Sequence, residues 1–224
     1  EALSGVNAAL LAIYDLSKMI EPSLNISDIK LLVKQGGKNG DWLHPDGVPH
    51  WCRPIIQDTS KLLIKKRIAI ATISTRASAK KYVDKSAPIL NDKLSALGAD
   101  IHSITLITDN KDEIVNYLQS TIAEHSPDII FLTGGTGFAA DDVTPDAIET
   151  VAQRIAIGLG ELLRHDSARH HTQYAWLSNC IAGIRDNTLM IALPGNPKAC
   201  GEGIDILQDL LPHALNMIQG EKHD

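Results

Sequence analysis

Apolar residues recur at helical spacing over residues 1–20. The stripe consists of Leu3, Val6, Leu10, Ile13, Leu16 and Ile20. Steps of three and four residues place such side chains on one face of an α-helix, so a helix is predicted here. Pro22 follows, and the chain is expected to leave the helix before it.

Residues 26–34 show a different period, because apolar and polar positions alternate. Ile29, Leu31 and Val33 fall on one side, as in a half-buried strand that ends at the glycine-rich stretch 36–40. One helix and one strand cannot bury both of their apolar surfaces. This first piece is therefore expected to pack on something else.

From Arg67 onward, buried apolar runs alternate with helical patterns. Such alternation favours a mostly parallel sheet covered by helices on both faces, an α/β fold preceded by a helix–strand remnant of an α+β domain. The predicted strands are 68–73, 101–107 and 128–133, with a hairpin over 180–193 that turns at Asp186–Asn187. The predicted helices are 84–97, 109–125, helices reaching about 168, and one from Asn196 to Gln219 with Pro197 in its first turn.

The stretch 41–66 between these parts resembles a connector. Pro45, Gly47, Pro49 and Pro54 interrupt any regular pattern there. We place an N-terminal domain fragment at 1–45, a connector at 46–66 and the main domain at 67–220.

Ligands of parallel α/β sheets bind at the carboxyl ends of the strands. The segments Thr72–Ser74, Thr108–Asp109 and Thr133–Gly137 should therefore share one rim. The turn at 194–197, which also precedes a helix, is expected beside them.

The richest part of this rim is the sequence FLTGGTGFAADDVTP at residues 131–145. Gly134, Gly135 and Gly137 allow the backbone to approach a bulky anion with amides pointing at it. Asp141 and Asp142 follow where a divalent cation could bridge protein and phosphate. Together these features point to phosphoryl or nucleotidyl chemistry.

Each of these features also has a plain structural explanation. The glycine loop could be a tight strand-to-helix turn. Asp109 could be a helix N-cap, and Asp142 could belong to the turn. Their convergence on one predicted rim favours the functional interpretation.

Composition narrows the possible partners. The chain has 224 residues and a net charge of −6, without a large Lys/Arg cluster, so neither nucleic acid nor a membrane surface is expected as a partner. It has no run of 18 apolar residues and no signal peptide pattern. Cys52, Cys180 and Cys200 form no close pair, which favours a reducing, cytoplasmic compartment.

Five motifs occur in order in this main part: ISTR at 73–76, TGGTG at 133–137, DVTP at 142–145, AGIR at 182–185 and LPGNP at 193–197. On these motifs, residues 67–219 resemble the molybdopterin adenylyltransferases, a type also found as the G domain of gephyrin. The resemblance implies a homotrimeric α/β enzyme that uses ATP and Mg²⁺ to adenylylate the phosphate of molybdopterin.

The resemblance also implies site residues. The essential aspartates of the family fall on Asp109 and Asp142, which would hold Mg²⁺. Contacts to nucleotide and pterin are expected from Ser74, Gly134, Gly135, Thr136, Gly137, Ser178, Pro194, Gly195 and Asn196, with Ser178 on the pterin side.

The chain departs from the family pattern at three positions. Thr75 stands where many members have Asp, and Asp141 and Asn179 replace arginines. Arg76, Arg185 and Lys198 are candidates to compensate for the lost positive charge. A scaffold that binds pterin or nucleotide without turnover is therefore the alternative.

The N-terminal piece carries the sequences IYDLSK at 13–18, LLVK at 31–34 and GGKNG at 36–40. These resemble the C-terminal end of cyclic pyranopterin monophosphate synthase. The resemblance places a catalytic pair at Asp15 and Lys18 and further ligand contacts at Lys34 and Lys38. Asp15 and Lys18 lie on one side of the predicted helix and could equally form a surface ion pair.

This second resemblance covers about 45 residues, without the earlier strands of that family. The chain alone is expected to lack a complete cyclising site. We expect a natural fusion of two consecutive activities of molybdenum cofactor biosynthesis, with the synthase (lyase) activity in the longer protein.

Overall fold

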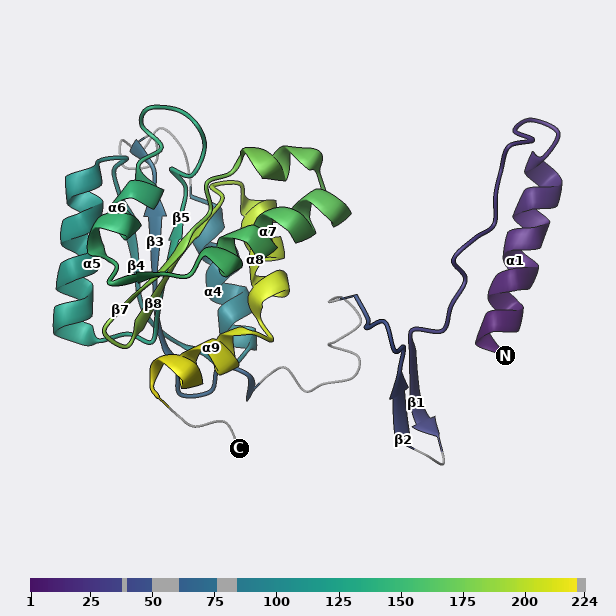
Figure 1. Cartoon of the computed structure of the whole chain (residues 1–224), viewed down its shortest axis with the longest axis horizontal. Coiled ribbons are helices and arrows are strands. Elements are labelled where there is room, and N and C mark those ends of the chain that lie inside the picture. Colours follow the sequence, from purple (N-terminus) through teal and green to yellow (C-terminus); the bar gives the residue numbers. More distant parts are fainter. Residues whose placement is uncertain (38–39, 50–60, 76–83, 221–224) are drawn as a thin grey trace. The chain divides into compact units, whose positions relative to one another are not determined.

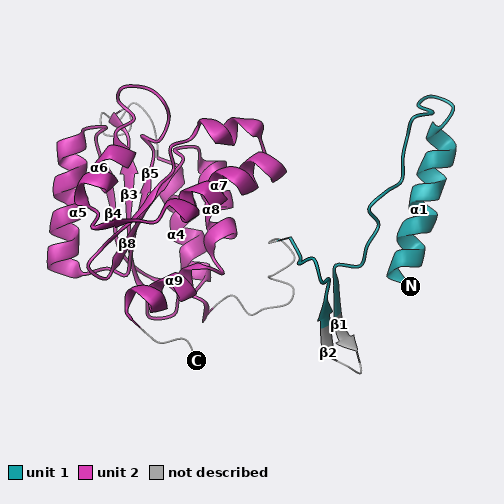
Figure 2. Ribbon diagram, in the orientation of Figure 1, with its two compact units in different colours: residues 1–58 teal, residues 59–224 magenta. Residues whose placement is uncertain are grey.

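The computed structural model describes residues 1–37, 40–49, 61–75 and 84–220. The chain divides into two compact units, residues 1–58 and 59–224 (Figure 2). Arg76 and Lys38 lie outside the described residues.

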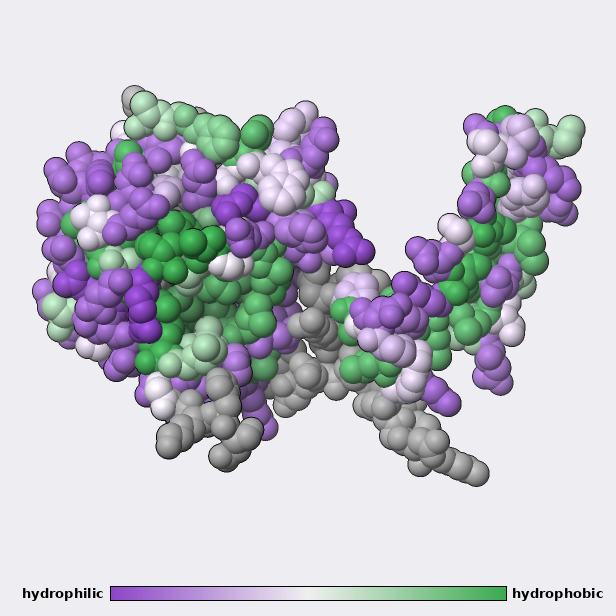
Figure 3. Space-filling view, in the orientation of Figure 1, coloured by the Kyte–Doolittle hydropathy of each residue, from purple (hydrophilic) through white to green (hydrophobic). Residues whose placement is uncertain are grey.

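The first unit contains one helix and one hairpin. Helix α1 spans Ala2–Ser17 and confirms the predicted stripe, but none of its residues is buried. Figure 3 shows apolar residues on the visible surface of this helix. Leu3, Val6, Ile13 and Leu16 are all exposed.

The strand predicted at 26–34 is wrong. Strand β1 begins only at Val33 and spans Val33–Gly37, where it pairs with the antiparallel strand β2, Gly40–Leu43. A strand forms where a partner supplies a ladder of hydrogen bonds, and here the partner reaches only as far back as Val33. The first three residues of the predicted connector stretch 41–66 also belong to this hairpin, because β2 runs to Leu43.

The second unit is a six-stranded sheet in the order β4-β3-β5-β8-β7-β6 (Figure 1). The four neighbouring strands β4, β3, β5 and β8 are parallel to one another. Strand β7 pairs antiparallel with β8, and β6 pairs antiparallel with β7. The strands are β3 (Arg67–Ile73), β4 (Asp100–Ile107), β5 (Ile129–Thr133), β6 (Arg154–Ile155), β7 (Ala182–Arg185) and β8 (Thr188–Leu193). The mostly parallel α/β sheet is therefore confirmed.

Helices cover both faces of this sheet. Helices α4 (Ser86–Ala96), α7 (Ile157–His170), α8 (Pro197–Leu207) and α9 (Leu211–Ile218) contribute to one core. Helices α5 (Lys111–His125) and α6 (Thr144–Val151) contribute to the other. Alternate residues of β3 enter the two cores, with Ile68 and Ile70 in the first and Ala69 and Ala71 in the second. This division follows from the two-residue period of a strand.

Two regions that were predicted to be helical, the one reaching about 168 and the final one to Gln219, contain interruptions. The short strand β6 separates α6 from α7, and the 3-10 helix η3 (Gln173–Leu177) follows α7. The final helix is two helices, because Pro212 lies in the first turn of α9. Proline lacks an N–H and crowds the carbonyl four residues before it, so a helix continuing through Gln208 would be interrupted.

No helix among the described residues is both long enough and apolar enough to cross a membrane.

Candidate active site

The rim predicted from the sequence exists. A cavity of about 750 Å³ opens where the parallel strands end. Its lining comes from segments far apart in the sequence: Thr72–Thr75, Asp84, Ser86, Asp109, Thr133–Gly135, Asp141, Asp142 and Gly195–Pro197. The structure therefore brings together most of the residues that the sequence nominated, and Thr136 and Gly137 continue the same loop.

The glycine loop turns its carbonyl oxygens toward the protein. Thr144 donates from Oγ1 to the Gly134 carbonyl at 2.8 Å and from its backbone N–H to that of Gly135 at 3.0 Å. Asn179 donates from its backbone N–H to the Thr136 carbonyl at 2.8 Å and from Nδ2 to that of Gly137 at 3.0 Å. Four successive carbonyls are thus satisfied internally.

The amides of the same loop have no such partners. Within the described chain, the N–H groups of Gly135, Thr136 and Gly137 donate no hydrogen bond. Backbone φ is +102° at Gly134 and +60° at Gly135, a conformation that glycine adopts readily. Successive amides in such a loop form an anion-binding concavity. The loop can therefore bind phosphate oxygens without breaking an existing contact.

Asp109 lies beside this loop and is not the cap of α5. The cap is Asn110, whose Oδ1 accepts from the Glu113 N–H at 3.1 Å. Asp109 instead accepts from the Thr75 N–H at 2.6 Å, and its own N–H donates to Thr75 Oγ1 at 3.1 Å. Thr75 thus fixes the carboxylate at the rim. A Cβ added to Gly135 would lie 3.5 Å from Asp109 Oδ1.

Asp142 lies against the other end of the loop. Its Oδ2 accepts from the Ala139 N–H at 2.9 Å, so the turn contact suggested by the sequence exists. The same oxygen lies 2.6 Å from the position that a Cβ on Gly137 would occupy. Asp109 and Asp142 therefore lie near opposite ends of one three-residue stretch, 135–137.

The turn at 194–197 packs directly on the glycine loop. Thr133 Oγ1 donates to the Pro194 carbonyl at 2.8 Å, and a Cβ on Gly195 would lie 3.2 Å from Gly134 Cα. Asn196 Oδ1 caps α8 by accepting from the N–H groups of Lys198 and Ala199. The N-terminus of α8 consequently faces the rim.

Two residues of the rim were not singled out from the sequence. Asp84 accepts from Thr72 Oγ1 at 2.6 Å and, through Oδ1, from the first amides of α4. Ser86 Oγ donates to the Gly195 carbonyl at 3.0 Å. An Asp just before a helical pattern is a capping signal that could have identified Asp84. Its proximity to the turn at 194–197 needed the fold.

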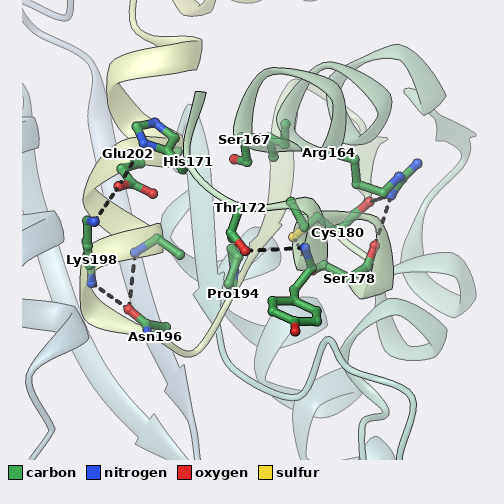
Figure 4. A pocket seen from close by; sticks show the side chains of 15 residues that line it. Arg164, Ser167, His171, Thr172, Ser178, Cys180, Pro194, Asn196, Lys198 and Glu202 are labelled. Atoms are coloured by element: carbon green, nitrogen blue, oxygen red, sulfur yellow. Dashed lines mark hydrogen bonds and ion pairs between the residues drawn. The ribbon is translucent and has the colours of Figure 1, made fainter. Parts of the chain in front are cut away.

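A second cavity, of about 300 Å³, lies on the other side of that turn (Figure 4). It is bounded by α7, η3 and α8, and Asn196 lines both cavities. Ser178 lines it, and Arg164 holds the adjoining backbone by donating to the Cys180 carbonyl at 2.7 Å. Ser178 is thus close to the rim but outside the main cavity.

The residues proposed to replace the lost arginines are not all at the rim. Arg185 donates to the Val151 carbonyl, at the hairpin end of β7. Lys198 lines the second cavity and its side chain is 83% exposed.

Of the site residues predicted in the first unit, Asp15 and Lys18 lie together. Lys18 Nζ lies 2.5 Å from Asp15 Oδ1, and both side chains are largely exposed. Lys34 is exposed on β1. The surface ion pair therefore exists, and a catalytic role remains a prediction.

Cys200 and Cys180 are buried beneath the turn, as expected of small apolar side chains. Cys200 Sγ lies 2.9 Å from Thr133 Oγ1. Burial raises the pKa of the Cys200 thiol to about 12 from its usual 9.0, and it also raises that of Cys180.

This shift predicts an alkaline loss of stability. Between pH 9 and pH 12 the native thiol of Cys200 keeps its proton while the unfolded chain releases it, so the free energy of unfolding falls over that range. Urea titrations at pH 8 and pH 10.5 should show a loss on the order of 1–2 kcal/mol that Cys200→Ser reduces. Equal losses in both proteins would assign the effect elsewhere, for example to Tyr117, whose pKa burial also raises.

Two family models match separate parts of the chain. The family model described as "Probable molybdopterin binding domain" matches residues 69–213, and that of the MoaC family matches residues 1–37. The molybdenum cofactor biosynthesis bifunctional protein of Synechococcus elongatus is 37% identical over 223 residues, which are all of this chain and 67% of the relative. A protein of the same description from Chlorobaculum tepidum is 30% identical. The chain spans 64% of its length.

Relatives named molybdopterin adenylyltransferase match about two thirds of this chain. The molybdopterin adenylyltransferase of Escherichia coli is 40% identical over 168 residues, covering 69% of this chain and 86% of the relative. Among solved structures, the molybdopterin biosynthesis enzyme MoaB of Thermus thermophilus matches with a TM-score of 0.65 and 30% identity. That match covers 71% of this chain and 99% of the enzyme.

Proposed function

Because this chain belongs to the family of probable molybdopterin binding domains, we propose that it is a molybdopterin adenylyltransferase of molybdenum cofactor biosynthesis. The reaction transfers AMP from ATP to the terminal phosphate of molybdopterin. Relatives named molybdopterin adenylyltransferase and covered along most of their length support this assignment.

The proposal rests mainly on which backbone groups of the glycine loop have hydrogen-bond partners. Its carbonyls are occupied by Thr144 and Asn179, whereas the amides of residues 135–137 have no partner in the described chain. A loop that served only as a tight turn would have no need for three open donors in a row, because buried or crowded amides are nearly always paired. The phosphates of ATP supply the missing acceptors.

The carboxylates beside the loop suit a magnesium ion. Among the described residues no group of three His, Cys, Asp or Glu could hold a metal by itself. Asp109 and Asp142 supply two oxygen ligands, and magnesium in nucleotide sites completes its shell with phosphate oxygens and water. The bound ion would neutralise charge on the ATP phosphates.

The residues of the chain act by positioning and by electrostatic stabilisation. The N–H groups of Gly135, Thr136 and Gly137 donate to the α-phosphate oxygens, where charge builds up during transfer. Asn196 and the N-terminus of α8 hold the other phosphates, and Ser74 lies at the same rim. An oxygen of the molybdopterin phosphate attacks the α-phosphorus, a new P–O bond forms, and the bond to pyrophosphate breaks. The attacking oxygen is already ionised, so no general base is required.

The direct test is incubation of the chain with molybdopterin and Mg-ATP, with mass spectrometry of the product. We expect adenylylated molybdopterin and one pyrophosphate for each transfer. ATP binding without product would contradict turnover and favour a binding scaffold. One observation favours that alternative: Asp141 adds a negative charge to the lining of a cavity meant for anions.

The first unit supports a second, narrower proposal. The MoaC match at residues 1–37 contains Asp15, Lys18 and Lys34, and Lys38 follows it directly. We propose that this segment belongs to a cyclic pyranopterin monophosphate synthase domain, whose lyase activity belongs to the bifunctional whole.

We also propose that the protein assembles as a homotrimer and acts in the cytoplasm. Ile104 and Leu106 are exposed on the edge strand β4, which fits an assembly such as a homotrimer. Light scattering that gave the mass of one chain would contradict the trimer. The use of ATP favours the cytoplasm as the site of the reaction.

A further inference from the structure

We propose that Asn179 is a positioning residue that adds a fourth backbone donor, the N–H of Phe138, to the phosphate-binding amides of the glycine loop. This inference rests on the proposed function, because it identifies a further group of this chain that contacts the nucleotide. It also explains how the rim can bind phosphate although an asparagine stands where the family resemblance places an arginine.

Asn179 holds two successive peptide groups of the glycine loop. Its backbone N–H donates to the Thr136 carbonyl at 2.8 Å, and its Nδ2 donates to the Gly137 carbonyl at 3.0 Å. The loop joins β5 to α6 (Figure 1), whereas Asn179 lies between η3 and β7. Two neighbouring carbonyls therefore point toward one residue from another part of the fold.

The direction of these carbonyls determines the direction of two amides. In a planar trans peptide, the C=O and the N–H lie on opposite sides of the C–N bond. The N–H of Gly137 shares its peptide group with the Thr136 carbonyl, and the N–H of Phe138 shares its peptide group with the Gly137 carbonyl. Both N–H groups consequently point away from Asn179, as do the successive donors of an anion-binding concavity.

The N–H of Phe138 is open, like the three amides before it. It donates no hydrogen bond to any part of the chain that the structure describes. The next amide, that of Ala139, donates to Asp142 Oδ2 at 2.9 Å. The open donors of residues 135–138 thus form an unbroken run that ends next to the residue binding Asp142, the proposed metal ligand. A phosphate held by this run therefore has a fourth donor available to it.

The side chain of Asn179 acts on the ligand through the peptide group that it holds. Donation to the Gly137 carbonyl polarises this peptide and strengthens its N–H as a donor. A fixed amide dipole stabilises developing negative charge without a charge of its own. Gly137 has no Cβ to hinder rotation, so without Nδ2 the peptide can turn its carbonyl toward the phosphate. The asparagine thus supplies through the backbone what an arginine would supply as a cation.

The phenylalanine content of the chain allows a direct test by NMR. The sequence contains two phenylalanines, Phe131 and Phe138, so ¹⁵N-labelled phenylalanine gives two backbone amide signals in the full chain. Phe138→Leu assigns them by removing one, and Phe131, buried in β5, is the internal reference. Saturation with Mg-ATP or Mg-pyrophosphate should move the Phe138 amide proton downfield, because its N–H then donates to a phosphate oxygen. The Phe131 signal should stay in place.

Asn179→Ala should abolish most of this downfield shift. It should also lower kcat for AMP transfer on the order of 10–10²-fold, less than outright removal of an oxyanion donor because the N–H is misdirected rather than deleted. KM for ATP should change by less than about threefold, since a contact that strengthens in the transition state is lost from kcat. A Phe138 signal that does not move in the wild type, or that moves equally in Asn179→Ala, would overturn the inference.

Gln153→Ala is the matched control, because Gln153 is also an exposed amide side chain that holds a turn. Its Nε2 donates to Asp186 Oδ1 at 3.0 Å, and its Oε1 accepts from the Asp186 N–H at 2.9 Å, at the hairpin of β7 and β8. It does not line the rim cavity. This variant should keep the Phe138 shift and a kcat within about twofold of the wild type.

The NMR measurement needs no turnover, so it separates this inference from the proposed function. A Phe138 shift that depends on Asn179, without any AMP transfer by the wild type, would refute the adenylyltransferase and leave the fourth donor in place. AMP transfer by a protein whose Phe138 signal does not move would refute the fourth donor alone.

Discussion

Replacing Asp142 with asparagine should lower the turnover of AMP transfer by about 10²–10³-fold, the range for loss of one preorganised electrostatic contact. Asparagine keeps an oxygen that can accept from the Ala139 N–H, so the loop contact survives while the charge is lost. Steady-state kinetics of the variant would measure the effect, and its thermal unfolding should match that of the wild type.

Asp146→Asn is the matched control for this substitution. Asp146 is exposed in the first turn of α6 and does not line the rim cavity. Its removal should leave turnover within about twofold, because exposed charges are strongly screened. Turnover of Asp142→Asn as high as that of Asp146→Asn would remove Asp142 from the site.

Gly134→Ala should be the most damaging single change to the fold of the second unit. A Cβ at this position would lie 2.3 Å from the Ile73 carbonyl oxygen, and φ is +102°. Backbone strain and overpacking each cost about 1–3 kcal/mol, so the free energy of unfolding should fall by about 3 kcal/mol or more. For a domain of this size, such a loss lowers the melting temperature by about 10 °C.

Gly158→Ala tests whether the cost comes from the site rather than from the added methyl group. Gly158 lies in α7, and a Cβ there would meet nothing within 4 Å. Alanine is the better helix former, so this variant should melt at the wild-type temperature or slightly above it. Equal melting temperatures for Gly134→Ala and the wild type would show that the loop relaxes without cost.

The sequence predicted the sheet and its rim well, because both depend on strong local signals. Uninterrupted apolar runs identify buried parallel strands, and the carboxyl ends of such strands meet at one edge. Ser74, Asp109 and the glycine loop could therefore be placed together without coordinates. The hairpin at 182–193 followed equally from a turn between two apolar segments.

The sequence could not show which of two adjacent residues caps a helix, or which segments pair and pack together. Asp109 and Asn110 are both good N-caps, and only the packing of Thr75 shows that Asn110 takes the role. Strand β1 depends on which partner strand is available, which alternation alone does not reveal. The contact of Ser86 with Gly195 joins residues more than a hundred positions apart, and that of His171 with Glu202 crosses between two helical elements.

The central claim is that Asp109 and Asp142 serve one metal-bound nucleotide, and a double-mutant cycle on the rate of AMP transfer tests it most directly. Asp109→Asn and Asp142→Asn should each lower turnover by about 10²–10³-fold, and the double variant should be little slower than the slower single one, because residues that act as a unit are not additive. Effects that multiply to about 10⁴-fold or more, or a single variant with wild-type turnover, would contradict a shared site.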